Sequence, residues 1–196
     1  MILISFSGLD GSGKTEQIAR LVRYLKKNQL RYKLIHIVQN SIANRFSGRK
    51  AAGRHSQTSA GFAGILARKI ALLIDILLFR ISLVTMRKYD IIIADRYFYD
   101  YLVNIYYLAE NQDPHVPPFL LHLIPRPDLS FYLSVDPKTA HQRKADQGIA
   151  YLEAKHQLFE KLKKRLKLTE IGDDKIENIA NTIASNIERK LISRKL

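Results

Sequence analysis

A glycine-rich segment near the start of the chain has the residue types and the spacing of a phosphate-binding loop. It reads Gly8, Leu9, Asp10, Gly11, Ser12, Gly13, Lys14 and Thr15, which matches Gly-x-x-x-x-Gly-Lys-Ser/Thr at every fixed position. Glycines let backbone N–H groups converge on phosphate oxygens without side-chain clash. The spacing predicts that Lys14 reaches the outer phosphates of a nucleoside triphosphate and that the Thr15 hydroxyl binds Mg²⁺.

The segments on either side of this loop, which we call the phosphate loop, are those that such a loop needs. Residues 1–6 are apolar and rich in strand formers, and apolar side chains recur behind the loop at helical spacing. Strand, glycine loop and helix in this order distinguish a phosphate site from a chance glycine-rich turn, and the helix start adds its positive dipole end. The predicted nucleotide-binding residues are Gly8, Asp10, Gly11, Ser12, Gly13, Lys14, Thr15 and Glu16.

A second group of chemical interest, Asp95-Arg96, follows a run of isoleucines at 91–93. This run is too short for a helix and too continuous for a half-exposed strand, so it predicts a central parallel strand buried on both faces. Ligands of open α/β sheets bind at the carboxyl ends of strands, so this pair and the phosphate loop can face one cleft. Asp95 could hold Mg²⁺ through water, and Arg96 could clamp a phosphate. Without the phosphate loop, a surface ion pair closing a strand would be the better interpretation.

Two further features of the sequence each have two possible interpretations. Arg143 and Lys144 precede a glycine-containing segment, where cations on a mobile lid could stabilise a moving phosphoryl group. An ordinary basic helix face fits these two residues nearly as well. The aromatic stretch at 97–107 could offer a ring for stacking a base, or it could simply pack in the core.

The elements that must position these residues alternate between strands and helices. We expect strands at 1–6, 32–38, 90–97 and 128–135, with a weak edge strand at 174–178. We expect helices behind the phosphate loop and at 61–87, 98–111, 137–147, 151–170 and 179–194, and a long polar loop at 39–60. This alternation predicts one α/β domain with a parallel sheet.

The stretch at 61–87 is apolar nearly all round. A transmembrane span is the obvious alternative, but Arg68, Lys69, Asp75 and Arg80 interrupt the stretch, leaving too few uninterrupted apolar residues to cross a bilayer. A helix of this kind is better explained by burial in a core or in a subunit interface.

Composition narrows the function further. The chain has no cysteine, which excludes disulfides, thiolate metal sites and cysteine nucleophiles. No signal sequence is recognisable at its start, so we expect a cytoplasmic protein that is not bound to a membrane. The net charge of +14 favours binding of phosphates. A nucleic-acid-binding surface is a weaker alternative, because basic residues spread along a chain carry no sequence readout.

Three blocks, at 7–17, 95–97 and 127–137, together resemble the thymidylate kinase family. The resemblance implies a three-layer P-loop kinase-type α/β fold with a five-stranded parallel sheet flanked by helices. It implies a single P-loop kinase domain over 1–196, with a lid segment at about 143–153. It also implies ATP and Mg²⁺ as cofactors, dTMP as the phosphate acceptor that gives dTDP, and a homodimer.

The resemblance also assigns roles to individual residues. Lys14, Asp95, Arg96 and Arg143 become the catalytic set, with Thr15 and Asp95 at the metal. Gly11 replaces an arginine that some members carry, which moves the catalytic arginine to the lid. There Ala150-Tyr151 stands in place of the family's Asp-Arg pair, which leaves Arg143 for that role. The predicted substrate-binding residues are Asp10, Arg96, Phe79, Arg80 and Tyr97.

The base-reading positions differ from the family's pattern. Counting back from Asp95 without a gap puts Ala71 and Asp75 where the family has a phenylalanine and an arginine, while Phe79 and Arg80 stand off register. A second hypothesis therefore keeps the fold and ATP and changes the acceptor to another nucleotide, a nucleoside or a phosphorylated metabolite. A third is an NTP-binding module without kinase activity that has a basic nucleic-acid-binding surface.

Overall fold

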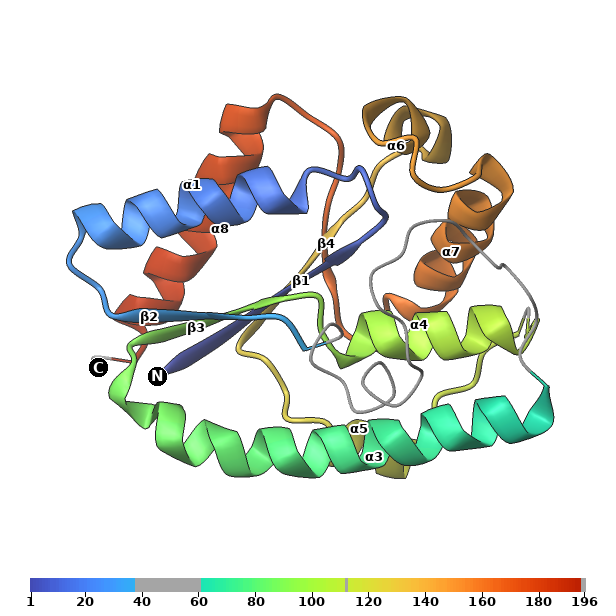
Figure 1. The fold of residues 1–196 in the computed structure, drawn as a ribbon. Coiled ribbons are helices and arrows are strands. Elements are labelled where there is room, and N and C mark those ends of the chain that lie inside the picture. The colour runs from blue at the N-terminus through green and yellow to red at the C-terminus, as the bar shows by residue number, and fades with distance from the viewer. Residues whose placement is uncertain (38–60, 112, 195–196) are drawn as a thin grey trace.

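The fold is a five-stranded parallel sheet between layers of helices (Figure 1). The computed structural model describes residues 1–37, 61–111 and 113–194. Its strands are β1 (Ile2–Gly8), β2 (Tyr32–Ile35), β3 (Ile91–Asp95), β4 (Leu129–Leu133) and β5 (Thr169–Ile171). They lie in the order β2-β3-β1-β4-β5, and every pair is parallel. The predicted fold class is confirmed.

Helices cover both faces of this sheet. They are α1 (Lys14–Lys27), α3 (Phe62–Thr85), α4 (Phe98–Leu108), α5 (Pro118–Leu123), α6 (Pro137–Arg143), α7 (Ile149–Leu162) and α8 (Ile176–Ile192). A 3₁₀ turn (Met86–Lys88) follows α3. In Figure 1, α1 and α8 lie on one side of the sheet, and α3, α4 and α7 lie on the other.

The isoleucine-rich central strands supply core to both faces. In β1, Ile4 and Phe6 pack with the residues of α1 and α8, whereas Leu3 packs with those of α3, α4 and α7. In β3, Ile93 packs with the residues of α1 and α8, and Ile92 packs with those of α3, α4 and α7. This alternation arises because successive side chains of a strand point to opposite faces. The prediction that 91–93 belong to a central strand buried on both faces is confirmed.

The fifth strand and its flanking helices differ from the prediction. The strand lies at Thr169–Ile171 and not at 174–178, and α7 ends at Leu162. Lys167 has a left-handed backbone (φ 54), which breaks the helix before the strand begins. Asp174 accepts hydrogen bonds from the backbone of Lys175 and the side chain of Asn178, so this segment starts α8. Helix α5 was not predicted, and the expected loop at 39–60 lies outside the described residues.

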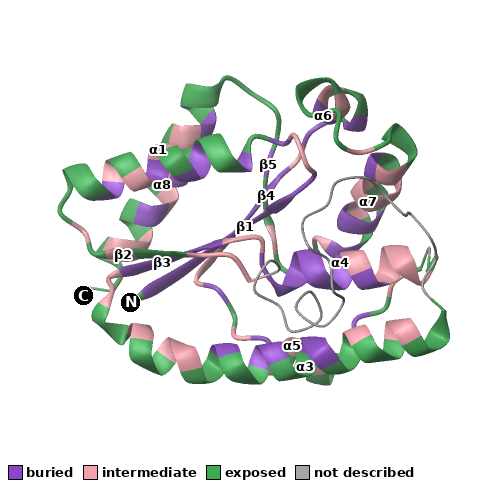
Figure 2. Cartoon of the chain, viewed as in Figure 1, coloured by how far each residue is buried: buried purple, intermediate pink, exposed green. Residues whose placement is uncertain are grey.

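Helix α3 is apolar on both sides and only half covered. Ala71, Leu72, Ile76 and Phe79 are buried against the rest of the protein. Large apolar side chains on the opposite side are exposed along the whole helix (Figure 2). Within the described parts of the chain, no helix is both long enough and apolar enough to traverse a bilayer. The part of the helix that faces solvent is therefore an apolar surface without a described cover.

Candidate active site

The phosphate loop connects the carboxyl end of β1 to the first turn of α1. Gly13 precedes α1 with φ 84, and Gly11 has φ 86, a region of backbone conformation that only glycine adopts without strain. A Cβ atom at Gly11 would lie 2.2 Å from the carbonyl oxygen of Ala140 in α6. The loop therefore packs directly against the backbone of the element that follows β4, and a side chain at position 11 has no room.

Lys14 lies inside the phosphate loop. Its Nζ donates hydrogen bonds to the carbonyls of Gly8 (3.0 Å) and Leu9 (2.5 Å) and to the hydroxyl of Ser12 (3.1 Å). Burial lowers the pKa of Lys14 to about 8, and the nearby Arg96 charge acts in the same direction. The ammonium group therefore occupies the space inside the loop that a phosphate would approach, and it can exchange its loop partners for phosphate oxygens.

The end of β3 brings Asp95 and Arg96 beside the phosphate loop. Asp95 pairs in register with Phe6 of β1, and the backbone N–H of Arg96 donates to the Phe6 carbonyl (3.0 Å). Arg96 has a left-handed backbone (φ 62), which turns its side chain across the loop toward Asp10. Non-glycine residues in this conformation cluster at functional sites.

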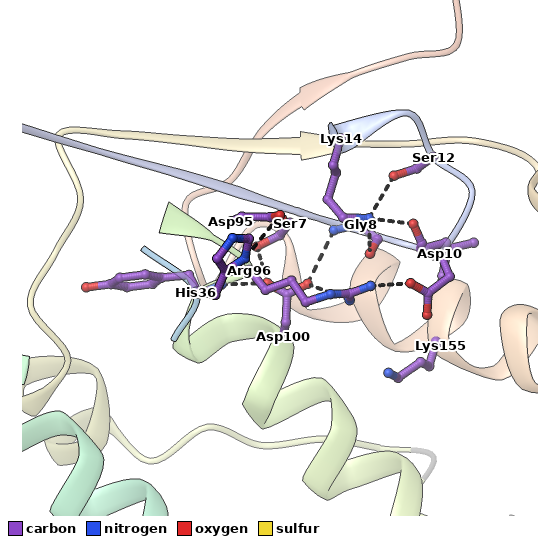
Figure 3. Close-up of polar contacts among 12 residues, drawn as sticks. Ser7, Gly8, Asp10, Ser12, Lys14, His36, Asp95, Arg96, Asp100 and Lys155 are labelled. Carbon is purple, nitrogen blue, oxygen red and sulfur yellow. Dashed lines mark hydrogen bonds and ion pairs between the residues drawn. The ribbon is translucent and has the colours of Figure 1, made fainter. Parts of the chain in front are cut away.

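Arg96 holds two carboxylates at once. Its guanidinium forms an ion pair with Asp10 and lies 3.8 Å from Asp100 (Figure 3). Burial alone would raise the pKa of Asp10, but Arg96, followed by Lys14, Lys155 and Lys144, outweighs burial and lowers that pKa. Burial likewise opposes the charge of Arg96, and Asp100, Asp10 and Asp95 outweigh it, so its pKa is raised. The site therefore contains a tightly balanced set of fixed charges.

Asp100 organises this cluster, and the sequence did not single it out for this role. Its carboxylate accepts hydrogen bonds from the Ser7 hydroxyl (2.6 Å) and from the backbone N–H of Tyr97 (3.0 Å), and it contacts the N–H of Gly8 (3.5 Å). It thus fastens the start of the phosphate loop to the start of α4. The available signal was an acidic residue in the first turn of a helix, where it can cap free N–H groups.

A histidine faces Asp95 from the neighbouring strand. His36 follows the end of β2, and its Nδ1 lies 3.3 Å from Asp95. This contact was not predicted from the sequence. The imidazole can orient the Asp95 carboxylate at the edge of the sheet where the phosphate loop opens.

The basic residues in and beside the segment predicted to be the lid, at about 143–153, have different partners. Arg143 forms an ion pair with Asp173 (3.0 Å), and Lys144 forms one with Asp146 (3.3 Å). Lys155, on α7, lies beside Asp10 (Figure 3), and its charge helps to lower the pKa of that carboxyl. The catalytic role of Arg143 remains a prediction, while the structure adds Lys155 to the groups around the phosphate loop.

Three predicted substrate contacts lie elsewhere. Tyr97 is fully buried, with its hydroxyl donating to the Pro125 carbonyl. Phe79 packs edge-on against Tyr97 and Phe98. Arg80 donates hydrogen bonds to the carbonyls of His122 and Leu123 (both 2.7 Å) at the end of α5. Large aromatic side chains gain most from full burial, which is why these rings fill the core beneath α4 and do not line the phosphate loop.

The donors at this edge of the sheet fit a nucleotide with Mg²⁺. Thr15 is exposed at the start of α1, and the Asp95 carboxylate lies at the end of the adjacent strand. Within the described residues no group of three or more histidine or acidic side chains forms a metal cage. Mg²⁺ is usually held by one or two protein ligands together with substrate phosphates and water, and Thr15 and Asp95 match this pattern.

Comparison with known proteins identifies the family. No match was found among curated protein sequences. The family model described as thymidylate kinase matches residues 6–191, which includes the phosphate loop, the Asp95-Arg96 pair and all five strands except the first residues of β1. Such a match covers nearly the whole chain, and the fold agrees with that of a P-loop kinase. The chain therefore belongs to the thymidylate kinase family of nucleotide kinases.

Proposed function

We propose that the protein transfers the γ-phosphoryl group of ATP to a nucleoside monophosphate, with dTMP as the first candidate acceptor and dTDP as the product. One observation carries the proposal: the buried Lys14 ammonium, inside the phosphate loop, lies beside the Arg96–Asp10 pair at the end of the adjacent strand. Cations for a donor phosphate and for an acceptor phosphate therefore share one edge of the sheet. Phosphoryl transfer needs such positioning and charge stabilisation more than it needs covalent chemistry.

The residues act on the two phosphates in distinct ways. Lys14 leaves the carbonyls of Gly8 and Leu9 and binds the outer phosphates of ATP. Arg96 exchanges Asp10 for the acceptor phosphate, which it holds in line with the γ-phosphorus. Thr15 and Asp95 would hold Mg²⁺, which neutralises charge on the phosphate oxygens when bound.

A different acceptor within the same fold is the second candidate. The ring of Phe79 is 8% exposed and packed among aromatic neighbours, and Arg80 is bound to the end of α5. The two side chains predicted to read a thymine are thus already engaged within the protein. Another base, or another phosphorylated metabolite, is consistent with this arrangement.

The test is ADP release from ATP and Mg²⁺ with a panel of nucleosides, nucleoside monophosphates and sugar phosphates at moderate salt. We expect turnover with a monophosphate, and we expect Lys14→Ala to lower kcat/KM at least about 100-fold because it removes a charge from the transferring phosphates. Near-normal activity of Lys14→Ala would contradict the proposed site. Turnover with dTMP would identify the acceptor, and turnover with another panel member alone would favour the second candidate.

A nucleic-acid-binding module without kinase activity remains the third hypothesis. It predicts tight, strongly salt-dependent binding of DNA or RNA and no ADP release. Measuring binding to both nucleic acids over a salt series, in parallel with the kinase panel, separates it from the first two.

We also propose that the protein is a homodimer that pairs through the exposed side of α3. This surface, the α3 stripe, consists of Phe62, Leu66, Ile70, Leu73, Ile74, Leu77, Leu78, Ile81 and Val84. It runs along a 24-residue helix, which is about 36 Å long. A second copy is the occupant that matches it best, since a two-fold axis sets an apolar patch against itself.

A further inference from the structure

Helix α7 carries Lys155, which lies just beyond the predicted lid segment at about 143–153. Lys155 is half-buried, and its Nζ donates a hydrogen bond to the Tyr151 hydroxyl (2.7 Å). The same ammonium lies 4.8 Å from the centre of the Tyr151 ring. Residues four apart in a helix lie on one face, so Tyr151 and Lys155 extend from α7 together.

Tyr151 is itself fixed by a neighbouring helix. Its ring packs edge-on against Tyr107 of α4, with the ring centres 5.0 Å apart and the planes at 84°. Because the ring is held on one side by α4, the hydroxyl that it offers to Lys155 has a defined position. Tyr151 therefore positions Lys155, because its hydroxyl limits the places that the Lys155 ammonium can occupy.

The Lys155 charge reaches the phosphate loop. It is one of the cations that lower the pKa of Asp10, after Arg96 and Lys14. Figure 3 shows Lys155 beside Asp10, on the side away from Lys14. Asp10 is thus surrounded by cations from the phosphate loop, from the end of β3 and from α7.

The other basic residues of the lid segment differ from Lys155 in their partners. Arg143 is 3.0 Å from the Asp173 carboxylate, and Lys144 is 3.3 Å from that of Asp146. The hydrogen-bond partner of Lys155 is a neutral phenol, which leaves its charge available for an anion. When Arg96 releases Asp10 for a substrate phosphate, Lys155 is placed to act on the same region.

The geometry points to Lys155, held by Tyr151, as the lid-side catalytic cation that binds the phosphoryl group during transfer. This rests on the proposed kinase function. In that step the acceptor phosphate oxygen forms a bond to the γ-phosphorus, and the bond from the γ-phosphorus to the bridging oxygen breaks, with its electron pair leaving on ADP. Lys155 stays protonated and donates hydrogen bonds to non-bridging oxygens, where negative charge must be balanced.

The first test compares Lys155→Met, Lys155→Arg, the rival cation variant Arg143→Met and a matched control, Lys27→Met, in the full-length protein. Lys27 is an exposed lysine at the end of α1 opposite to the phosphate loop. We expect Lys155→Met to lower kcat about 100-fold while the KM for ATP changes less than about three-fold, as for loss of a contact made in the transition state. Lys155→Arg should recover most of the rate because it restores the charge, and Lys27→Met should stay within about two-fold of the unsubstituted protein. Equal rates for Lys155→Met and the unsubstituted protein, or a larger loss in Arg143→Met than in Lys155→Met, would overturn the assignment.

Tyr151→Phe tests separately whether the Tyr151 hydroxyl positions Lys155. It keeps the ring packing on Tyr107 and removes only the hydroxyl that holds Lys155, so it should lower kcat about 3- to 10-fold with an unchanged thermal midpoint. A rate identical to that of the unsubstituted protein would remove Tyr151 from the proposal. A fall in thermal midpoint matching the loss of rate would show that Tyr151 is merely structural.

A binding measurement separates this inference from the kinase function. If the unsubstituted protein turns over no acceptor, the proposed function has failed, and inorganic tripolyphosphate then serves as the probe in thermal-shift titrations at constant ionic strength. We expect Lys155→Met to weaken tripolyphosphate binding at least about five-fold and Lys27→Met to leave it within about two-fold, since Lys27 lies at the end of α1 opposite to the phosphate loop. Equal binding by Lys155→Met and the unsubstituted protein would refute the role of Lys155 even in that case.

Discussion

Lys14 shows how the phosphate site is charged at the level of a single residue. Lys14 is 6% exposed, and its ammonium depends on three oxygens of its own loop for solvation. In the unfolded chain, water would solvate the same charge fully. Folding therefore disfavours the proton on Lys14, and its pKa falls from 10.5 to about 8.

This shift predicts a pH dependence of stability that Lys14 alone causes. Between pH 8 and 10.5 the unfolded chain holds the Lys14 proton and the folded protein does not, so the free energy of unfolding should rise with pH in this window, by about 2 to 3 kcal/mol. The measurement is urea unfolding from pH 7 to 10.5, compared with Lys14→Met as the control without the titrating group. A difference between the two proteins that stays constant over this window would contradict the assigned pKa.

Asp100 gives a second prediction at this scale. Its buried carboxylate satisfies Ser7, Tyr97 and Arg96 together, so Asp100→Ala should lower the free energy of unfolding by about 3 kcal/mol. The matched control is Asp113→Ala, in which the lost side chain is exposed, and it should change stability by less than about 0.5 kcal/mol. Equal effects of the two substitutions in urea unfolding would mean that Asp100 does not hold the loop to α4.

The predicted site residues that lie where the sequence placed them are those whose position depends only on local pattern. The phosphate loop and Asp95-Arg96 follow strands directly, so the parallel sheet brings them together whatever the helices do. Asp100, Lys155 and His36 depend on how α4, α7 and the end of β2 are oriented, and helical periodicity does not fix that. Phe79 and Tyr97 show the opposite case, because an aromatic residue suits a core as well as it suits a base.

At the scale of elements, the contact between the phosphate loop and α6 sets the tolerance of the loop glycines. Gly11→Ala should be severe, because its Cβ would meet the Ala140 carbonyl at 2.2 Å in addition to the strained backbone. Gly13→Ala has a nearly equal φ and nothing within 4 Å of its Cβ, so it should cost only the strain of about 1 to 2 kcal/mol. Thermal unfolding and ATP titration of both variants compare the two costs. Equal losses would show that the contact with α6 is unimportant.

The same scale explains where the prediction of elements failed. The segments with a strong apolar pattern, such as 91–93 and 61–87, were assigned to the correct type of element, because a short isoleucine run predicts a strand and a long apolar run predicts a helix. Strand β5 has three residues, of which only Ile171 is buried. It forms because it pairs with β4, and its residue types show almost no alternation of apolar and polar positions from which a strand could be predicted. The basic stretch before it looks helical until Lys167 adopts a left-handed backbone, a conformation that residue type does not predict for lysine.

For the whole molecule, the α3 stripe predicts the oligomeric state. Ile81→Glu places a charge within the proposed interface, near the C-terminal end of the α3 stripe, so it should convert the dimer to a monomer without loss of fold. Ile192→Glu is the matched control, since Ile81 and Ile192 are 66% and 61% exposed and lie on different helices. Size-exclusion chromatography with light scattering gives both masses. A monomer for the unsubstituted protein, or a dimer for Ile81→Glu, would contradict the interface.

Under the proposed function, in which Arg96 binds the acceptor phosphate, the pair formed by Arg96 and Asp10 makes substrate entry an ion exchange. Before any ligand binds, the guanidinium already has an anion, so an incoming group must compete with a carboxylate that the protein itself supplies. A phosphate dianion competes with a carboxylate for a guanidinium far better than a neutral hydroxyl does. If Arg96 binds the acceptor, the free protein therefore selects by negative charge before it reads any base, and this threshold favours nucleotides over nucleosides.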